Sequence, residues 1–391
     1  MIPRDAEPRL RSLAALYPIV TVTGPRQSGK TTLCRSTFPG LQYISLEPLD
    51  VREAALSDPR GFLAQLPNGA VIDEVQHAPG LLSYLQVEVD ERPTPGRFIL
   101  TGSQQLHVNA AVTQSLAGRT GLIQLLPPSW AELRRFSNAP SDLFQVLWAG
   151  SYPRIYDRAI PAGQWLADYV ATYVERDVRQ LSRVTDLRAF TDFLRLAAGR
   201  TACEINLSKL GADAGVTHNT ARAWLSVLEA SYLVVRLPGW HATIRKRVVK
   251  APKLHFLDTG LLCYLLGIRE PEQLLSHPLR GAVFETWVAS ELYKQNAHSG
   301  RETSLYHYRD AARVEVDIVA DGDGAVILAE AKSGATVASD FFTTLRDLTP
   351  KLRTALAPRA IEGRIVYGGA ARQVRGEILV LPWSEIDSVS W

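Results

Sequence analysis

The sequence predicts an α/β protein in which a three-layer parallel sheet is followed by a helical segment and by a second α/β domain. Three observations lead to this expectation. Short apolar strands alternate with helical segments in the first part of the chain, which is the pattern of a parallel sheet with helices on both faces. Helical apolar spacing dominates residues 164–198, and strand-like alternation returns at residues 314–320. The chain has 391 residues, enough for two or three domains, and its 46% hydrophobic and 21% charged residues are typical of globular proteins.

The first predicted strand, residues 19–23, leads directly into a glycine-bounded loop and a helix. The loop matches the pattern Gly-x-x-x-x-Gly-Lys-Ser/Thr, which in this context predicts a phosphate-binding P-loop rather than an ordinary glycine-rich turn. Lys30 is expected to reach the β- and γ-phosphates of ATP, and the Thr31 hydroxyl is expected to ligate Mg²⁺. ATP and Mg²⁺ are therefore the expected cofactors. The expected ATP-binding residues are Gly24, Pro25, Arg26, Gln27, Ser28, Gly29, Lys30, Thr31 and Thr32.

A second apolar strand, residues 69–72, ends in two carboxylates, Asp73 and Glu74. Before it we expect a strand at residues 42–46 and a mostly helical stretch over residues 51–66 with a break at Asp58-Pro59. An acidic pair at a strand end, about forty residues after a P-loop, matches a Walker B element. Asp73 is expected to hold Mg²⁺ through water, and Glu74 to orient and deprotonate the attacking water. The alternative is an acidic pair on the surface.

Four segments together resemble the AAA-type ATPases of bacteria and archaea that carry a C-terminal domain of uncertain function. They are GPRQSGKTT at 24–32, AVIDEVQ at 70–76, FILTGSQ at 98–104 and SLAGR at 115–119, and further similarity lies at 150–153, 173–178 and 256–261. The resemblance implies that Ser103, with Thr101 behind it, senses the γ-phosphate. It also implies that Arg119 is an arginine finger reaching a neighbouring subunit's nucleotide, and therefore that the active form is a ring. The alternatives are a strand-terminal turn for Ser103 and a solvated surface side chain for Arg119.

The middle of the chain has the pattern of a helix-turn-helix. Residues 207–225 read as a short helix, a glycine-containing turn and a second helix capped by Thr217. His218, Asn219 and Arg222 fall on the outward face of that second helix near its start, where proteins that read base edges place their contacts.

Two strands, at residues 232–237 and 250–257, are expected to complete a winged helix. The basic residues around this predicted wing are Arg245, Lys246, Arg247, Lys250 and Lys253. They are expected to neutralise DNA phosphates without reading sequence, as a local patch, because the net charge of the chain is only +3. The alternative is an ATPase lid or protein contact with the basic run as a solvated loop.

The last part of the chain resembles a PD-(D/E)XK nuclease domain. Asp317 lies in an alternating strand, and Glu330 and Lys332 follow across a hairpin, with Val316 where the motif name has Pro. Asp317 and Glu330, joined by Glu285 from a preceding helix over residues 281–295, are expected to form an oxygen-ligand site for Mg²⁺. Lys332 is expected to polarise or deprotonate the attacking water. The alternative is a domain that keeps the fold without an active metal site.

We therefore expect an AAA-type ATPase domain at 1–155, a helical and winged-helix domain at 156–260, and a restriction-endonuclease-like α/β domain at 261–391. The expected function is that of a Mg²⁺-dependent ATPase that assembles as a ring, expected to be hexameric, and couples hydrolysis to binding or remodelling of duplex or branched DNA. The alternatives are a nucleotide-gated switch and an ATP-gated, structure-specific nuclease. Three well-separated cysteines, and the lack of an apolar signal segment or long apolar run, predict a cytoplasmic protein without a membrane partner.

Overall fold

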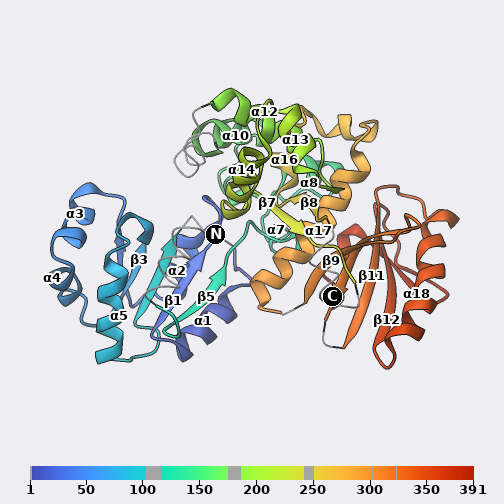
Figure 1. The fold of residues 1–391 in the computed structure, drawn as a ribbon. Helices are drawn as coiled ribbons and strands as arrows, with labels where there is room; N and C mark the ends of the chain where they lie inside the picture. Colours follow the sequence, from blue (N-terminus) through green and yellow to red (C-terminus); the bar gives the residue numbers. More distant parts are fainter. Residues whose placement is uncertain (1, 103–115, 175–185, 242–250, 302, 323) are drawn as a thin grey trace. The chain divides into compact units, whose positions relative to one another are not determined.

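The computed structural model describes residues 2–102, 116–174, 186–241, 251–301, 303–322 and 324–391 (Figure 1). The chain divides into two compact units. The first comprises Met1–Pro128, Ala230–Tyr232 and Ala297–Gly300. The second comprises Ser129–Glu229, Leu233–Asn296 and Arg301–Trp391, so it contains most of the predicted winged-helix segment and of the predicted nuclease-like domain.

The first unit is built around a five-stranded parallel sheet with strand order β2-β3-β4-β1-β5. Its strands are β1 (Ile19–Thr23), β2 (Gln42–Ser45), β3 (Ala70–Asp73), β4 (Phe98–Gly102) and β5 (Thr120–Gln124). Its helices are α1 (Glu7–Leu16), α2 (Lys30–Thr37), α3 (Leu49–Ser57), α4 (Pro59–Ala64), η1 (Val75–His77) and α5 (Leu81–Glu91). The predicted α/β class with a parallel sheet is confirmed.

Helices cover both faces of this sheet. Buried side chains of α1 and α2 pack with Val20, Val71 and Ile99 on one face, and those of α3, α4 and α5 pack with Ile72 and Leu100 on the other. All residues of β1 and β4 are buried, which explains their near-continuous apolar sequence. Because β4 lies between β1 and β3, the carboxyl ends of these three strands meet at one edge, where the P-loop begins.

The second unit begins with a helical region and a small antiparallel sheet of order β6-β8-β7. The sheet strands are β6 (Cys203–Glu204), β7 (Val234–Leu237) and β8 (Lys253–Phe256). The helices before and around it are α7 (Trp130–Leu133), α8 (Leu143–Ala149), α9 (Pro153–Asp157), α10 (Ala162–Tyr169), the π-helical turn η2 (Val170–Val174), α12 (Leu187–Ala198), α13 (Leu207–Asp213), α14 (His218–Ala230), α16 (Thr259–Leu265), η3 (Pro271–Leu275) and α17 (Arg280–Ser299).

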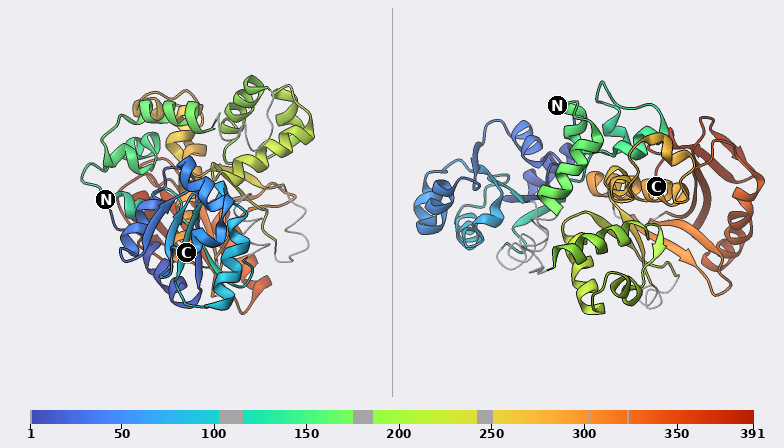
Figure 2. Two further views of the ribbon diagram at one scale, coloured as in Figure 1. Left: turned by 90° about the vertical axis from the view of Figure 1, so that its left-hand side faces the viewer. Right: turned by 90° about the horizontal axis from the view of Figure 1, so that it is seen from above.

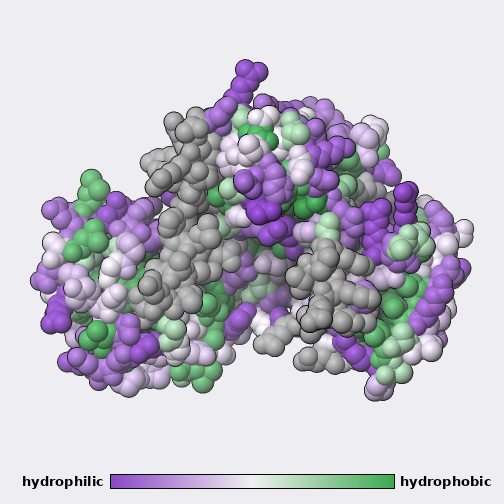
Figure 3. All heavy atoms as spheres, in the orientation of Figure 1, coloured by the Kyte–Doolittle hydropathy of each residue, from purple (hydrophilic) through white to green (hydrophobic). Residues whose placement is uncertain are grey.

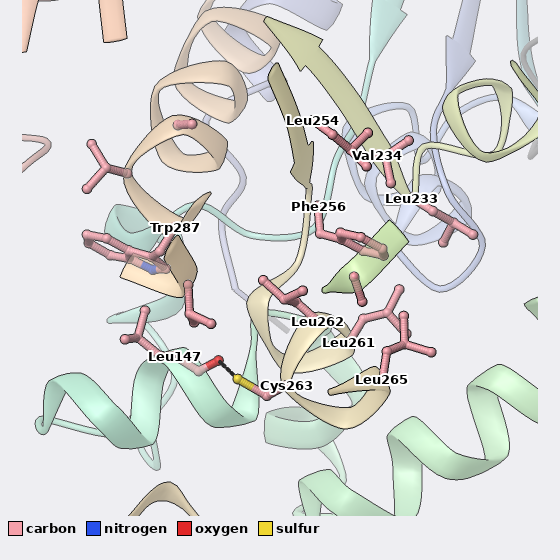
Figure 4. Close-up of a cluster of buried hydrophobic side chains, with 14 of the residues drawn as sticks. Leu147, Leu233, Val234, Leu254, Phe256, Leu261, Leu262, Cys263, Leu265 and Trp287 are labelled. Atoms are coloured by element: carbon pink, nitrogen blue, oxygen red, sulfur yellow. Dashed lines mark hydrogen bonds between the residues drawn. The ribbon is translucent and has the colours of Figure 1, made fainter. Parts of the chain in front are cut away.

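A buried apolar cluster joins these elements, as Figure 4 shows. Phe256 of β8 points toward Leu262 of α16, Val234 of β7 lies beside Leu254 of β8, and Trp287 of α17 belongs to the same cluster. The Cys263 thiol donates a weak hydrogen bond to the carbonyl oxygen of Leu147 at 3.6 Å. The small sheet is therefore fixed by packing against helices and not by its short strands alone.

The second unit ends in a six-stranded mixed sheet of order β13-β14-β12-β11-β10-β9. Its elements are β9 (Ser304–Arg309), β10 (Glu315–Asp321), β11 (Ala325–Lys332), η4 (Ser339–Phe342), α18 (Thr343–Leu356), β12 (Ala360–Tyr367), β13 (Gln373–Arg375), β14 (Ile378–Pro382) and η5 (Trp383–Glu385). Strands β9, β10 and β11 are antiparallel neighbours, whereas β11, β12 and β14 are parallel. Helix α18 lies along one face of this sheet (Figure 2).

The face drawn in Figure 3 mixes hydrophilic and hydrophobic residues. Large apolar side chains that are exposed include Leu49 and Val374. In the part of the chain that the structure describes, no helix has the length and apolar character needed to cross a membrane.

Candidate functional site

The P-loop connects β1 to α2 in a conformation that requires glycine. Gly24 has φ 150°, and a Cβ atom there would lie 2.0 Å from the carbonyl oxygen of Leu125. Gly29 has φ 95° and is the N-cap residue of α2. A side chain at either position would be strained, so glycine is needed for the loop to lead into the start of the helix, where backbone amides attract anions.

Arg4, in the N-terminal segment, contacts this loop. The sequence did not predict a role for Arg4. Its guanidinium donates hydrogen bonds to the carbonyl oxygens of Ser28 at 2.7 Å and Leu126 at 2.8 Å. Arg4 is buried, and no local sequence pattern marks it because its partners lie 24 and 122 residues away.

Lys30 lies inside the loop that the motif assigns to phosphates. Its side chain is buried, and its ammonium donates hydrogen bonds to the carbonyl oxygens of Gly24 at 3.0 Å and Pro25 at 2.8 Å. Burial lowers the pKa of Lys30, although the carboxylates of Glu74 and Asp73 act in the opposite direction. The positive charge is therefore held by loop carbonyls and two nearby acids.

Asp73 accepts hydrogen bonds from hydroxyl groups on three different elements. Thr31 donates to Oδ2 at 2.9 Å, Tyr43 donates to Oδ2 at 2.8 Å, and Thr101 donates to Oδ1. Burial and the hydrogen bond to Asp73 raise the pKa of Tyr43 to about 12. The Thr31 hydroxyl and the Asp73 carboxylate are oxygen donors of the kind that Mg²⁺ prefers, so these residues fit a magnesium site.

Glu74 directly follows β3 and has a left-handed backbone, with φ 57° and ψ 47°. Its amide donates a hydrogen bond to the Thr101 hydroxyl at 3.2 Å, and Gln76 donates one to its carboxylate. Left-handed conformations of residues other than glycine are costly and concentrate at functional sites. Thr101 contacts both Asp73 and Glu74, whereas Ser103, the residue predicted to sense the γ-phosphate, lies outside the described residues.

Arg119 directly precedes β5 in the first unit. Its guanidinium forms a two-point ion pair with Asp90 of α5, with Nε 2.6 Å from Oδ1 and Nη2 2.8 Å from Oδ2. About a third of the Arg119 side chain is exposed. Its role as an arginine finger stays a prediction.

The predicted DNA-contacting residues have different positions. Asn219 and Arg222 are exposed on the first turns of α14, and His218 is half-buried at its start. Thr217 accepts a hydrogen bond from the Thr220 amide at 3.2 Å, as an N-cap does. The other predicted residues, Arg245, Lys246, Arg247 and Lys250, lie outside the described residues.

Lys253 is not on the surface, so the prediction that it contacts DNA phosphates is wrong. Only 3% of its side chain is exposed, because β8 is the central strand of the small sheet and is buried along its whole length. Its ammonium lies 2.8 Å from Glu285 and 2.5 Å from Glu315. The positive charge of Lys253 is therefore neutralised within the second unit.

The structure brings together the four residues of the predicted nuclease site. Asp317 of β10 accepts a hydrogen bond from the Ala331 amide of β11 at 2.9 Å, between Glu330 and Lys332. The Lys332 ammonium lies 2.6 Å from Glu330 on the same strand. Burial raises the pKa of Glu285 of α17, and the nearby charge of Asp317 raises it further. Burial and the Asp317 charge also raise the pKa of Glu330 to about 7.

This arrangement does not fit a magnesium ion. The residues that the structure describes include no group of three or more His, Cys, Asp or Glu side chains placed to hold a metal ion. Lys253 lies 3.9 Å from Asp317 as well as contacting Glu285 and Glu315, so an ammonium group stands among these carboxylates. The sequence did not predict that Glu315, two residues before Asp317 on the same strand, belongs to this cluster. Polar residues at every second position are also typical of a strand with one face in solvent, so Glu315 had no distinguishing signal.

Three regions of the chain match known domain families. Residues 16–134 match the AAA domain, residues 140–272 match a domain of unknown function, DUF8612, and residues 280–386 match another, DUF4143. The parallel sheet, the P-loop and the AAA match define an AAA-type P-loop ATPase fold, which supports nucleotide binding and ATPase activity.

The chain is 33% identical over 331 residues to the uncharacterized protein Rv2008c of Mycobacterium tuberculosis, a match that spans 82% of this chain and 71% of the relative. The protein therefore belongs to the same family as Rv2008c.

Two solved structures show weaker similarity. The Walker-type ATPase PABY2304 of Pyrococcus abyssi is 16% identical, with a TM-score of 0.46, over 67% of this chain and 94% of its own. The RuvB Holliday junction branch migration motor of Thermotoga maritima is 18% identical, with a TM-score of 0.30, over 61% of this chain and 90% of its own. Both TM-scores are below 0.5, too low to extend the fold assignment beyond the AAA domain.

Proposed function

We propose that the protein is a Mg²⁺-dependent ATPase that assembles as a ring and couples hydrolysis to binding or remodelling of duplex or branched DNA. The observation that carries the ATPase part is the convergence of three hydroxyl groups on Asp73 at the edge where the P-loop begins. Thr31 and Asp73 would hold Mg²⁺, which neutralises phosphate charge when bound. Thr31 lies in the first turn of α2 and Asp73 ends β3, so the fold itself sets their approach.

In this proposal Glu74 acts on the attacking water, and two contacts of Glu74 support the role. Its backbone amide is tied to Thr101, and its carboxylate is held by Gln76. As the water oxygen bonds to the γ-phosphorus, Glu74 takes the proton and the bond from phosphorus to the β–γ bridging oxygen breaks. Lys30 stabilises the charge that develops on the phosphates. The positions of Lys30 at the start of α2 and of Glu74 directly after β3 support these roles.

The DNA-binding part of the proposal draws support from the second unit. Its elements follow the order α12, β6, α13, α14, β7 and β8, with the three strands in one antiparallel sheet, which is the order expected of a winged helix. Exposed Asn219 and Arg222 lie on the first turns of α14, the position from which a recognition helix contacts DNA. An exposed arginine there would also neutralise a phosphate.

The decisive experiment is steady-state ATP hydrolysis with and without linear and four-way-junction DNA. We expect DNA to stimulate the wild type, Glu74→Gln to abolish turnover at every DNA concentration, and a double variant of Asn219 and Arg222 to alanine to keep the basal rate but lose stimulation. A variant of exposed Arg158 to alanine is a matched control because it lies on another part of the second unit. Hydrolysis that no DNA changes would favour the alternative of a nucleotide-gated switch.

A further inference from the structure

The carboxylate cluster of the second unit contains a cation supplied by the chain itself. The cluster consists of Glu285, Glu315, Asp317 and Glu330. The ammonium of Lys253 lies 2.8 Å from Glu285, 2.5 Å from Glu315 and 3.9 Å from Asp317. Lys253 comes from β8, whereas its partners come from α17 and β10, so three separate elements converge on one charge.

Burial makes this contact strong. The side chains of Lys253, Glu285 and Asp317 are 3%, 13% and 15% exposed, so their charges are poorly screened by water. Burial alone lowers the pKa of Lys253, but the carboxylates of Glu285 and Asp317 outweigh this effect and raise it. The ammonium therefore stays protonated, and removing it would leave buried carboxylates without compensation.

A second lysine, Lys332, contacts the remaining carboxylate of the cluster, Glu330. Lys332, the residue predicted to activate water, is bound to Glu330 at 2.6 Å. The second carboxylate oxygen of Glu330, Oε1, is buried and has no hydrogen-bond partner among the described residues. Four carboxyl groups thus face two ammonium groups, and Oε1 of Glu330 is left for a further cation or donor.

We propose that Lys253 is the resident cation of this cluster, takes the place of a divalent metal, and keeps the site free of metal while its side chain is in place. The site then cuts no phosphodiester bond, and the nuclease-like residues serve to hold β8 against α17 and β10. With the Lys253 ammonium among them, the carboxylates of the described residues are not placed to hold a metal ion; replacing Lys253 by a neutral residue lets them close around a divalent cation. This inference is independent of the proposed ATPase and DNA-binding function.

The first test measures Mn²⁺ binding to the nucleotide-free full chain by equilibrium dialysis. Wild type and Asp317→Asn are expected to bind equal amounts of Mn²⁺, since Asp317 holds no metal when Lys253 is present. If the wild type binds one Mn²⁺ per chain and Asp317→Asn does not bind it, the proposal is overturned. This comparison leaves Lys253 unchanged, so it does not depend on whether a Lys253 variant folds.

The second test uses Lys253→Met, which keeps the unbranched side chain up to the position of Cε and removes the ammonium group. We expect Lys253→Met to bind one additional Mn²⁺ per chain, at least tenfold more tightly than any Mn²⁺ in the wild type. The double variant Lys253→Met with Asp317→Asn is expected to lose this additional site. Lys253→Arg keeps a cation and is expected to bind no additional metal. A folded Lys253→Met chain without additional Mn²⁺ contradicts the proposal, whereas an unstable one that Mn²⁺ restores supports it.

Discussion

The hydroxyl of Tyr43, on β2, donates a hydrogen bond of 2.8 Å to the carboxylate of Asp73, at the end of the neighbouring strand β3. The same carboxylate oxygen accepts the Thr31 hydroxyl bond at 2.9 Å. Tyr43 therefore acts on the proposed magnesium site through Asp73 and is a positioning residue. The raised pKa of Tyr43, about 12, means that it stays a hydrogen-bond donor throughout the neutral pH range.

Tyr43→Phe removes this hydrogen bond and keeps the aromatic ring, whose face contacts Arg35. A hydrogen bond to a charged group contributes about 1.5 kcal/mol, so kcat/KM for ATP is expected to fall on the order of tenfold. The loss should appear mainly in kcat and be smaller at saturating Mg²⁺, because Asp73 is displaced and not removed. Tyr84→Phe, a change at an exposed tyrosine of α5, is the matched control. Equal kcat/KM for Tyr43→Phe and wild type would rule out the positioning role.

Arg4→Ala frees the P-loop from the N-terminal segment. Because Arg4 binds the carbonyl oxygens of Ser28 and Leu126, we expect the Kd for ATP to rise about tenfold, with a smaller effect on kcat. Arg4→Lys, which can keep one of the two hydrogen bonds, should have an intermediate Kd. Nucleotide binding is measured by calorimetry.

The control for Arg4 is Arg11→Ala, which removes an exposed arginine of α1 that, among the described residues, forms an ion pair with Glu7. Its Kd for ATP is expected to match that of the wild type. If both variants lower the melting temperature equally and leave the Kd unchanged, Arg4 contributes to stability and not to the loop.

Sequence patterns were sufficient for the parts of the site that are local in the chain. The P-loop residues follow one strand directly, and Asp73 and Glu74 end another, so strand and loop patterns located them. Tyr43 and Arg4 could not be found in this way, because each acts on a partner at least 24 residues away and neither lies in a distinctive pattern. Only the strand order, with β2 beside β3, brings Tyr43 to Asp73.

Lys253 shows why a charge pattern can mislead. Its place at the end of a basic run indicated an exposed side chain, as most lysines have. However, β8 lies between β6 and β7 and all four of its residues are buried, so strand position overrides charge. The compensating acids, Glu285 and Glu315, lie more than thirty residues further along the chain, where no local pattern connects them to Lys253.

The proposed ring can be tested by mixing two inactive variants. Arg119→Ala keeps Glu74 but lacks the proposed finger, whereas Glu74→Gln keeps Arg119 but cannot activate water. If Arg119 acts on the neighbouring subunit, an equal mixture should recover on the order of a quarter of the wild-type rate per chain, because half of the intact Glu74 sites would receive an intact Arg119. The rate is measured after co-incubation with ATP and Mg²⁺.

The matched control for the mixing experiment is Asp90→Ala, which removes the ion-pair partner of Arg119 and keeps the arginine. It should hydrolyse ATP at close to the wild-type rate, since exposed ion pairs contribute little to stability. A mixture as inactive as its separate components, together with a monomeric mass in solution, would exclude a finger acting between subunits.

A buried ion pair in the second unit offers a prediction about stability. Lys294 lies 2.9 Å from Glu291, its neighbour on α17, and donates to the Ser151 hydroxyl at 3.0 Å. Both ionic side chains are 2% exposed, and Glu291 also accepts the Trp130 amide bond at 2.6 Å. Lys294→Met leaves the Glu291 charge buried without its cation and should lower the free energy of unfolding by about 3–5 kcal/mol. Replacing Glu291 by Gln in the same chain should recover most of this loss, because the amide oxygen can still accept from Trp130.

Unfolding in urea, followed by tryptophan fluorescence, measures this effect selectively, because all eight tryptophans lie in the second unit. Arg158→Ala removes an exposed partner of Asp157 and is expected to change the free energy of unfolding by less than about 0.5 kcal/mol. A loss below about 1 kcal/mol in Lys294→Met would mean that water reaches Glu291 and that the pair is not fully buried in solution. Recovery in the double variant distinguishes charge compensation from simple loss of packing, because the side chain of Lys294 is absent from both variants.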